Sequence, residues 1–124
     1  MHFVIHAETS RSPEVQVGGT IGLHDFLALL DAVLASPHWR PGKRVLVDCR
    51  EGDFSLVLVF DVHTLVKAFR QLDAQIGRSR MAVVVASAAE YGLVRMFEQL
   101  LHGQVRLETA VFFAVDEARA WLAR

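Results

Sequence analysis

The sequence has a single cysteine, Cys49, so no disulfide bond can form within the chain. Neither sign of charge dominates, because 13 lysine and arginine residues stand against 14 aspartate and glutamate residues. A chain without a basic excess lacks the field that attracts polyanions, so we expect no nucleic-acid partner. No apolar run approaches the ~18 residues that cross a bilayer, and we expect no transmembrane segment.

Recurrent catalytic and metal-binding motifs are also missing. The chain has no glycine-rich phosphate loop, no Gly-x-Ser-x-Gly elbow and no closely paired histidines. We therefore expect no cofactor, no metal site and no enzymatic activity. Residues 1–6 lack the basic segment and the long apolar stretch of a secretion signal, which makes a cytoplasmic protein the default expectation.

A small hydrolase or transferase remains a remote alternative, with Cys49 or Ser55 as its nucleophile. A reactive cysteine needs an activating neighbour, and no histidine predictably lies beside Cys49. A buried structural thiol is therefore the favoured interpretation.

Hydrophobic residues make up 52% of the 124 positions, which is enough for one core, and we expect one domain over residues 1–124. The clearest pattern is an apolar run at 81–86 followed by an amphipathic segment at 88–101. Ser87 and Glu90 have the Ser-x-x-Glu spacing of a capping box. This pattern predicts a buried strand leading into a capped helix, which is half of a βαβ crossover.

The remaining elements come before and after that unit. Alternating segments at 2–8 and 14–18, separated by turn residues at 10–13, predict an antiparallel hairpin. Apolar residues at helical spacing predict helices at about 22–35, capped near Thr20, and at about 60–76.

Three further segments complete the pattern. Residues 44–49 predict a strand with a polar exit at 48–53, and residues 109–114 predict another strand. A last short helix begins with Asp116 as its cap, whereas 56–60 fits a strand or a helix entry equally well. The order predicts an α/β fold. We expect a mixed sheet of about five strands, with an antiparallel starting hairpin, later strands parallel, and about four helices.

Five segments, in this order, carry a resemblance to a known family: His38-Trp39-Arg40-Pro41-Gly42, Val45-Leu-Val-Asp48, Ala82-Val-Val-Val, Tyr91-Gly-Leu-x-Arg-Met-Phe97 and Asp116-Glu-Ala-x-x-Trp-Leu122. Together they resemble the SpoIIAA-like family of small bacterial proteins, grouped with STAS domains and the CRAL-TRIO lipid-binding fold. The resemblance implies a SpoIIAA-like (STAS-like) domain. It also implies one of two functions, a protein interaction switched by serine phosphorylation or the binding of an apolar small molecule.

Ser55 is the phosphoacceptor candidate that this resemblance implies. STAS anti-sigma antagonists carry their serine in an Asp-Ser-Ser-Gly type motif at a helix start, and the matching region here is Asp53-Phe54-Ser55-Leu56. The hydroxyl is present, but the paired serines and the glycine are missing. A helix-cap or turn serine is the favoured interpretation.

Other candidates for a ligand or interface site come from position and residue type. Charged residues at the carboxyl end of a parallel strand lie where open α/β sheets place ligands, and a tryptophan in a polar loop suits a pocket rim or the core edge. Tyr91 and Arg95 at i, i+4 would stack to form a recognition surface, unless Arg95 pairs with Glu98 instead. The candidates are Trp39, Asp48, Arg50, Asp53, Tyr91 and Arg95.

Two expectations concern the helix at 88–101. Gly92 costs roughly 1 kcal/mol relative to alanine, which suggests that a neighbour passes close to the backbone there. Leu93, Met96, Phe97 and Leu100 are expected to form its core stripe, while Val94 points elsewhere.

These observations favour a non-enzymatic regulatory or protein-interaction module of SpoIIAA/STAS type. We expect self-association into a homodimer or other homo-oligomer, through a helix face or sheet edge, and a regulatory protein as a further partner. The alternative is a binder or carrier of an apolar small molecule or lipid. Its pocket would lie between the sheet and the helices at about 22–35 and 60–76.

Overall fold

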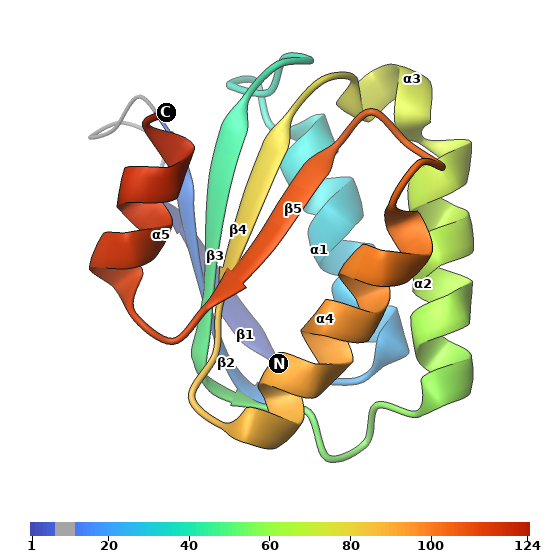
Figure 1. Cartoon of the computed structure of the whole chain (residues 1–124), viewed down its shortest axis with the longest axis vertical. Helices are drawn as coiled ribbons and strands as arrows, with labels where there is room; N and C mark the ends of the chain where they lie inside the picture. Colours follow the sequence, from blue (N-terminus) through green and yellow to red (C-terminus); the bar gives the residue numbers. More distant parts are fainter. Residues whose placement is uncertain (7–11) are drawn as a thin grey trace.

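The chain folds around a five-stranded sheet with helices on both faces (Figure 1). The computed structural model describes residues 1–6 and 12–124, so parts of the predicted 2–8 strand and 10–13 turn lie outside the described residues. The strands follow one another across the sheet in chain order, β1 antiparallel to β2 and the later neighbours parallel. The predicted α/β fold with a mixed sheet is confirmed. The strands are β1 (His2–His6), β2 (Glu14–Thr20), β3 (Arg44–Asp53), β4 (Arg80–Val84) and β5 (Glu108–Phe112).

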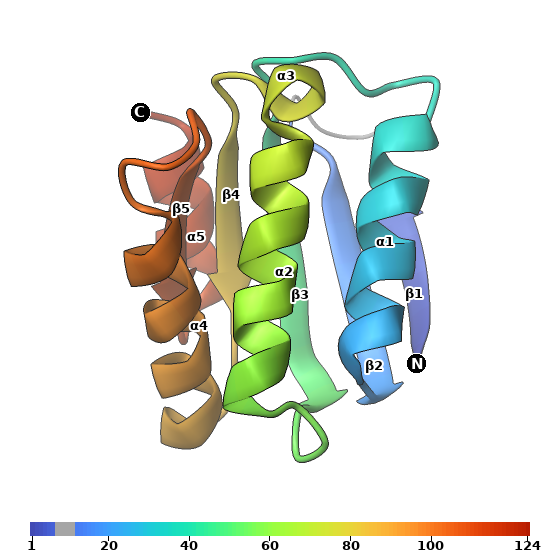
Figure 2. The ribbon, with the colours of Figure 1, turned by 90° about the vertical axis from the view of Figure 1, so that its right-hand side faces the viewer.

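Three of the helices lie side by side on one face of the sheet, here called the inner face, and α5 lies alone on the outer face (Figure 2). The described residues form five helices rather than the predicted four, because the helix expected at about 60–76 is interrupted at Leu72, which has φ −99° and ψ 10°. The helices are α1 (Leu23–Ala35), α2 (Val59–Gln71), α3 (Asp73–Ile76), α4 (Ala88–Leu101) and α5 (Val115–Leu122).

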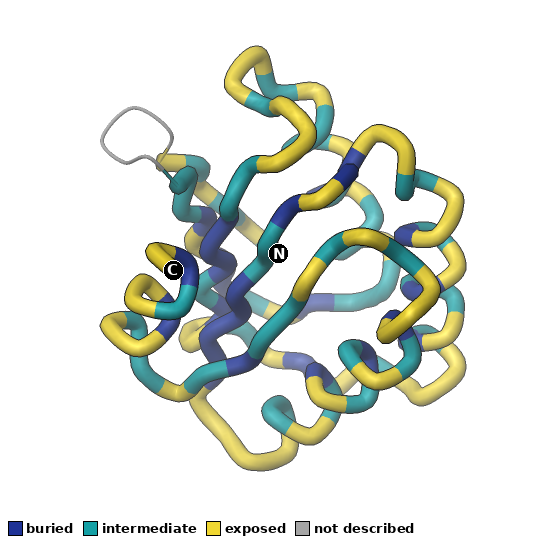
Figure 3. The backbone as a smooth tube through the Cα atoms, turned by 45° about the horizontal axis from the view of Figure 1, so that its top comes forward, coloured by how far each residue is buried: buried dark blue, intermediate teal, exposed yellow. Residues whose placement is uncertain are grey.

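Strand periodicity divides the core between the two faces. Successive side chains of a strand point to opposite faces. Val45, Val47 and Cys49 of β3 accordingly belong to the inner core, whereas Leu46 packs with Ala118 and other residues under α5. Figure 3 shows the buried segments concentrated in the sheet and exposed ones along the outer sides of the helices.

The outer face is covered only in part. Helix α5 packs against β3, β4 and β5, and no described helix covers the outer side of β1 and β2 (Figure 1). Val4 on β1 is 53% exposed there, and Gln16 on β2 is also exposed. The outer side of the hairpin is therefore open to solvent.

Strand β3 runs to Asp53, so the prediction that 48–53 is a polar exit is wrong. The strand continues because Gly18, Gly19 and Thr20 of β2 pair in parallel with Glu51, Gly52 and Asp53, after a register shift between Gln16 and Gly18. A Cβ at Gly52 would lie 2.5 Å from Ile21 Cδ1, so this glycine permits a close approach rather than a turn.

The helix starts only partly match the predictions. Helix α1 begins after Gly22, whose N–H donates to Asp25 Oδ2 at 2.8 Å, because Thr20 is still paired in β2. Helix α5 begins after Ala114, which leaves Asp116 in the first turn instead of at the cap. Sequence patterns locate a helix within a residue or two but do not settle which residue turns first.

Helix α4 has the predicted Ser87 cap, since Ser87 Oγ accepts the Glu90 N–H at 3.3 Å. The Ser87 hydroxyl also donates to Glu90 Oε1 at 3.1 Å, so that carboxylate engages the hydroxyl rather than a backbone N–H. Two expectations for this helix are wrong. A Cβ at Gly92 would meet nothing within 4 Å, and Val94 is buried in the inner core because the helix turns that side toward the sheet.

Candidate functional site

An apolar cavity of about 140 Å³ lies between the inner face of the sheet and helices α1, α2 and α4. Nearly all of its wall is hydrocarbon, contributed by side chains of at least four elements. Members from the helices and strands include Phe26, Leu30, Val33, Val47, Cys49, Val62, Leu65, Phe69, Val83 and Phe97. Its place between the sheet and the 22–35 and 60–76 segments is the one that the alternative hypothesis requires.

Helical and strand periodicities build this wall. Phe26, Leu30 and Val33 recur on one side of α1 at i, i+4 and i+7 spacing. Val62, Leu65 and Phe69 recur on one side of α2 at i, i+3 and i+7 spacing. Two edge-to-face aromatic pairs brace the wall, Phe26 with Phe54 at 5.4 Å and Phe69 with Phe97 at 5.1 Å between ring centroids. Helices and strands thus form most of the wall, and the connections that contain Trp39, Phe54 and Val57 complete it.

The lining of the cavity extends along both α1 and β3. Its lining on α1 extends from Leu23 to Leu34, a span of about 16 Å at the helical rise. Its lining on β3 extends from Val45 to Cys49, about 13 Å at the strand rise. The lining residues of α1 are only half-buried, so the cavity approaches the surface along α1.

Polar side chains at the cavity wall are engaged elsewhere. Asp61 Oδ2 accepts the Leu58 N–H at 2.9 Å and so caps α2. Ser79 Oγ donates to the Ile76 carbonyl at 2.6 Å and accepts the Gly42 N–H at 3.1 Å.

Arg80 is the third polar residue at the cavity wall, and its guanidinium points toward α5. It donates to the Trp121 carbonyl at 3.3 Å and lies 5.4 Å from the Trp121 ring centroid. These three residues therefore offer no charged anchor to a molecule inside the cavity.

Cys49 lines the cavity and is 1% exposed. Burial, reinforced by the nearby Asp48 and Glu90 carboxylates, raises the pKa of the Cys49 thiol to about 12. A thiol with this pKa is protonated at neutral pH, and a protonated thiol is a poor nucleophile. The prediction of a buried structural thiol is confirmed.

Trp39 combines the two roles considered for it. It is half-buried, lines the cavity, and packs against the inner core from the loop before β3. Its indole Nε1–H donates to the Gln75 carbonyl at 3.1 Å, which ties this loop to α3. The side chain therefore closes one end of the cavity.

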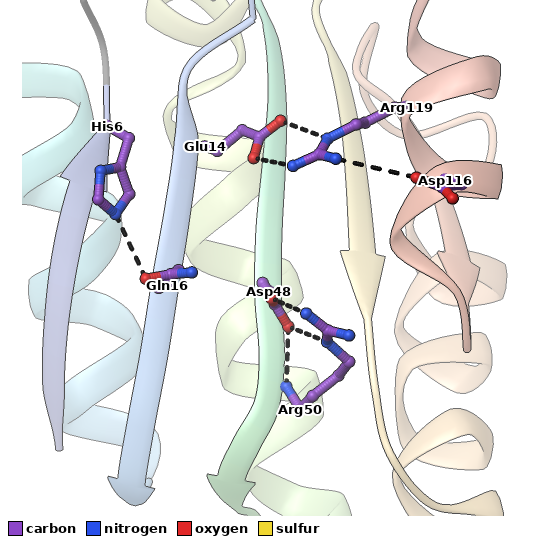
Figure 4. A network of polar contacts seen from close by, with 7 residues as sticks. All are labelled: His6, Glu14, Gln16, Asp48, Arg50, Asp116 and Arg119. Carbon is purple, nitrogen blue, oxygen red and sulfur yellow. Dashed lines mark hydrogen bonds and ion pairs between the residues drawn. The ribbon is translucent and has the colours of Figure 1, made fainter. Parts of the chain in front are cut away.

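Asp48 and Arg50 lie on the outer face, away from the cavity (Figure 4). The Arg50 guanidinium donates to both Asp48 oxygens, at 2.9 and 2.8 Å. These hydrogen bonds are the main reason that the pKa of Asp48 lies below its ordinary value. Both residues lie within β3, which continues to Asp53, so Asp48 is not at the carboxyl end of this strand. The role of Asp48, Arg50 and Asp53 in ligand or partner binding stays a prediction.

A second ion pair on the outer face joins β2 to α5. Arg119 donates to both oxygens of Glu14, at 2.8 and 2.9 Å, and lies 3.9 Å from Asp116 (Figure 4). The hydrogen bonds from Arg119 lower the pKa of Glu14 despite its partial burial. The charges on this face are thus paired with one another.

Ser55 is exposed and does not cap a helix, because α2 begins three residues later, after Leu58. Its N–H donates to Asp53 Oδ1 at 2.9 Å, which makes it a turn serine and lowers the pKa of Asp53. The cap interpretation is wrong and the turn interpretation is confirmed. The role of Ser55 as a phosphoacceptor stays a prediction.

Tyr91 and Arg95 do not stack on each other. The Tyr91 ring stacks on Phe113, with centroids 4.8 Å apart and planes 15° from parallel. Arg95 instead donates to Glu98 Oε2 at 3.0 Å, the alternative considered for it. Glu98 Oε1 is buried without a hydrogen-bond partner, and burial raises the pKa of this carboxyl.

Sequence reasoning missed one exposed feature beside the cavity, which we call the apolar segment, residues 56–60. Leu58 is 64% exposed and Phe60 76%, and Leu56 and Val59 are also exposed. Within the same connection, Phe54 and Val57 line the cavity. For Phe60 the sequence contained a signal, because this residue falls outside the helical stripe that Val62 begins. Val59 continues that stripe at i, i+3 spacing, so its exposure could not be predicted from the pattern.

No protein-family model matches the sequence, and no curated protein matches it. A crystal structure of an uncharacterised protein of the DUF3478 family from Shewanella loihica PV-4, described as having a SpoIIAA-like fold, is similar in structure. The TM-score is 0.61 at 17% sequence identity, over 97% of this chain and 93% of that chain. The SpoIIAA-like fold suggested by the sequence is confirmed at the level of the fold.

Within residues 1–6 and 12–124, no three His, Cys, Asp or Glu side chains are grouped so that they would hold a metal ion. No helix in these same residues has both the length and the hydropathy to cross a membrane.

Proposed function

We propose that this protein binds a small, uncharged, apolar molecule in the cavity between its sheet and helices, and that it catalyses no reaction on it. The observation that carries the proposal is the apolar cavity of about 140 Å³. Apolar cavities of about this size stay dry and bind small hydrocarbons.

Energetics favour an occupied cavity. At ~24 cal/mol per Å³, an empty cavity of about 140 Å³ costs roughly 3 kcal/mol. That is a large fraction of the ~5–15 kcal/mol by which proteins are stable. A bound hydrocarbon restores the missing contacts, so the chain gains stability from a ligand.

The chemistry of the wall restricts the ligand class. Asp61, Ser79 and Arg80 direct their polar atoms to partners outside the cavity. A buried charge without a partner is strongly unfavourable. The ligand is therefore hydrocarbon-like along its buried part, and small because the cavity measures about 140 Å³.

Benzene is a suitable probe for this site. We expect saturating benzene to raise the thermal midpoint by several degrees, because binding at about 100 times the dissociation constant adds ~2.7 kcal/mol. Native mass spectrometry of protein purified without added ligand provides the second measurement, with a retained apolar molecule as the expected additional mass.

The native thiol supplies an internal control. The Cys49 thiol is protonated at neutral pH, so its slow modification by a small neutral methanethiosulfonate is followed at pH 9, under conditions where the protein modified without benzene is detected. Because Cys49 lines the cavity, bound benzene should slow this modification. An unchanged midpoint together with unchanged Cys49 modification would contradict the proposal.

The apolar segment supports a second candidate function, the regulatory protein interaction of STAS type. Four large apolar side chains exposed within 56–60 are typical of a contact surface, and Ser55 immediately precedes them. A phosphate at Ser55 would add about −1.5 to −2 charges beside Asp53.

Pull-down with wild-type, Phe60→Ser and Ser55→Asp proteins tests this second function. We expect a partner retained by the wild type to be lost with both variants. The Lys67→Ala protein, changed at an exposed position outside the segment, is the matched control.

A further inference from the structure

Strand β1 is an edge of the sheet and pairs only with β2 in the described structure. In an antiparallel ladder, every second residue turns its N–H and C=O away from the neighbouring strand. An edge strand therefore presents a row of backbone donors and acceptors to any strand that approaches it.

This edge lacks the usual protection. Natural edge strands are guarded by lysine, proline or a bulge, or are covered by another element. The β1 sequence His-Phe-Val-Ile-His contains neither lysine nor proline, and its register with β2 runs without a shift from His2 to His6.

The opposite edge differs. Helices α4 and α5 pack against β5 on its two faces, and Phe112 of β5 contacts the Trp121 ring. On the outer side of β1 no helix is present among the described elements, and the apolar Val4 is 53% exposed there. Among the described residues, β1 is thus the edge strand whose outer face no helix covers.

The β1 sequence is complementary to itself in an antiparallel arrangement. A two-fold axis at Val4 places Val4 opposite the partner's Val4 and Phe3 opposite the partner's Ile5. The same axis places His2 opposite the partner's His6 at each end of the pair. Phe3 and Ile5 already pack on the inner core while remaining half-buried, so a second strand would extend this core. Aromatic and β-branched side chains form favourable cross-strand pairs.

We infer that β1 pairs with β1 of a second copy of this chain, which joins the two five-stranded sheets into one continuous sheet. The same residues meet their counterparts on both sides, as a two-fold dimer interface requires. The partner is a second copy because the centred register pairs Phe3 with the partner's Ile5 on the inner face, Val4 with the partner's Val4 on the outer face, and histidine with histidine at both ends. This inference goes beyond the proposed function and does not depend on it.

Cross-linking through Val4 tests the register. Residues opposite one another in an antiparallel pair have Cα atoms ~4.5–5.5 Å apart, within disulfide range. Val4→Cys should therefore form a covalent dimer under mild oxidation. Native Cys49 is buried and should not interfere.

Gln16→Cys is the matched control, since Gln16 is exposed and lies beside Val4 in the β1–β2 register. In the dimer its two copies are separated by three strand spacings, ~14 Å, which is too far for a disulfide. Cross-linking of V4C no faster than Q16C would overturn the inference.

Analytical ultracentrifugation supplies an independent measurement. We expect the wild type to dimerise with increasing concentration and Val4→Lys to raise the dissociation constant at least about tenfold, because like charges then face each other across the axis. Circular dichroism checks that V4K is folded. A wild type that is monomeric at all concentrations, or a V4K protein that dimerises like the wild type, would also overturn it.

Discussion

Filling the apolar cavity should stabilise the protein, and adjacent residues of β4 allow a matched comparison. Val83 lines the cavity on the inner face, whereas Val84 is completely buried under α5 on the outer face. The change of either residue to isoleucine adds one methylene in the same strand. The two variants differ in whether space exists to receive it.

The expected magnitudes have opposite signs. A newly buried methylene in the cavity contributes about 0.8 kcal/mol, so Val83→Ile should raise the free energy of unfolding by that amount. An extra methylene in a filled core typically costs about 1–3 kcal/mol, so Val84→Ile should lower it. The stabilisation stays below the roughly 3 kcal/mol assigned to the whole cavity of about 140 Å³.

Urea unfolding at neutral pH measures both free energies. For a chain of this size, the increase expected for V83I corresponds to about 2–5 °C in the thermal midpoint. The benzene-induced shift should shrink in V83I, because the variant occupies part of the same space. If V83I destabilised the protein as much as V84I, the inner core would already be filled, and the reasoning for a ligand cavity would be refuted.

Three further predictions concern polar groups. Burial raises the pKa of Glu98, so its ionisation lowers stability as pH rises above its ordinary value of 4.5. In urea unfolding, the free energy of unfolding of Glu98→Gln, relative to that of the wild type, should accordingly be higher at pH 7 than at pH 4.5. A relative free energy that is the same at both pH values would contradict this. The pKa of Glu14 is lowered by Arg119, so this pair stabilises above pH 4.5 and the stabilisation is lost as pH falls through the folded-state value. A double-mutant cycle with E14Q and R119A should give no more than about 1 kcal/mol at pH 7, since Arg119 is exposed, and a vanishing coupling near pH 2. Ser87→Ala should cost about 1 kcal/mol through loss of the α4 cap, whereas Ser55→Ala should stay within about 0.5 kcal/mol in thermal unfolding, because Ser55 caps no helix.

Much of the fold could be predicted because its signals are local. The strand at β4, the Ser87 cap and α4 follow from apolar periodicity and one hydroxyl at the right position. The element order then indicates a mixed sheet. The end of β3 could not be predicted, because residues 50–53 are polar and extend the strand only through pairing with β2 across a register shift.

The candidate site shows the same division. Apolar stripes on α1 and α2 indicate which side chains point inward, but a filled core and a cavity have identical stripes. Only the distances between elements decide whether these side chains leave space. Likewise, the i, i+4 spacing of Tyr91 and Arg95 allows these two side chains to stack. In the structure the Tyr91 ring stacks instead on Phe113, which directly follows β5.

By itself, then, the sequence determined the types and order of the elements and the burial of Cys49, because periodicity and composition act over a few residues. The tertiary structure alone decided the apolar cavity, the extension of β3 to Asp53, and the uncovered outer side of β1 among the described residues. Each of these depends on the packing distance or register between segments far apart in the chain, and no local pattern carries that information.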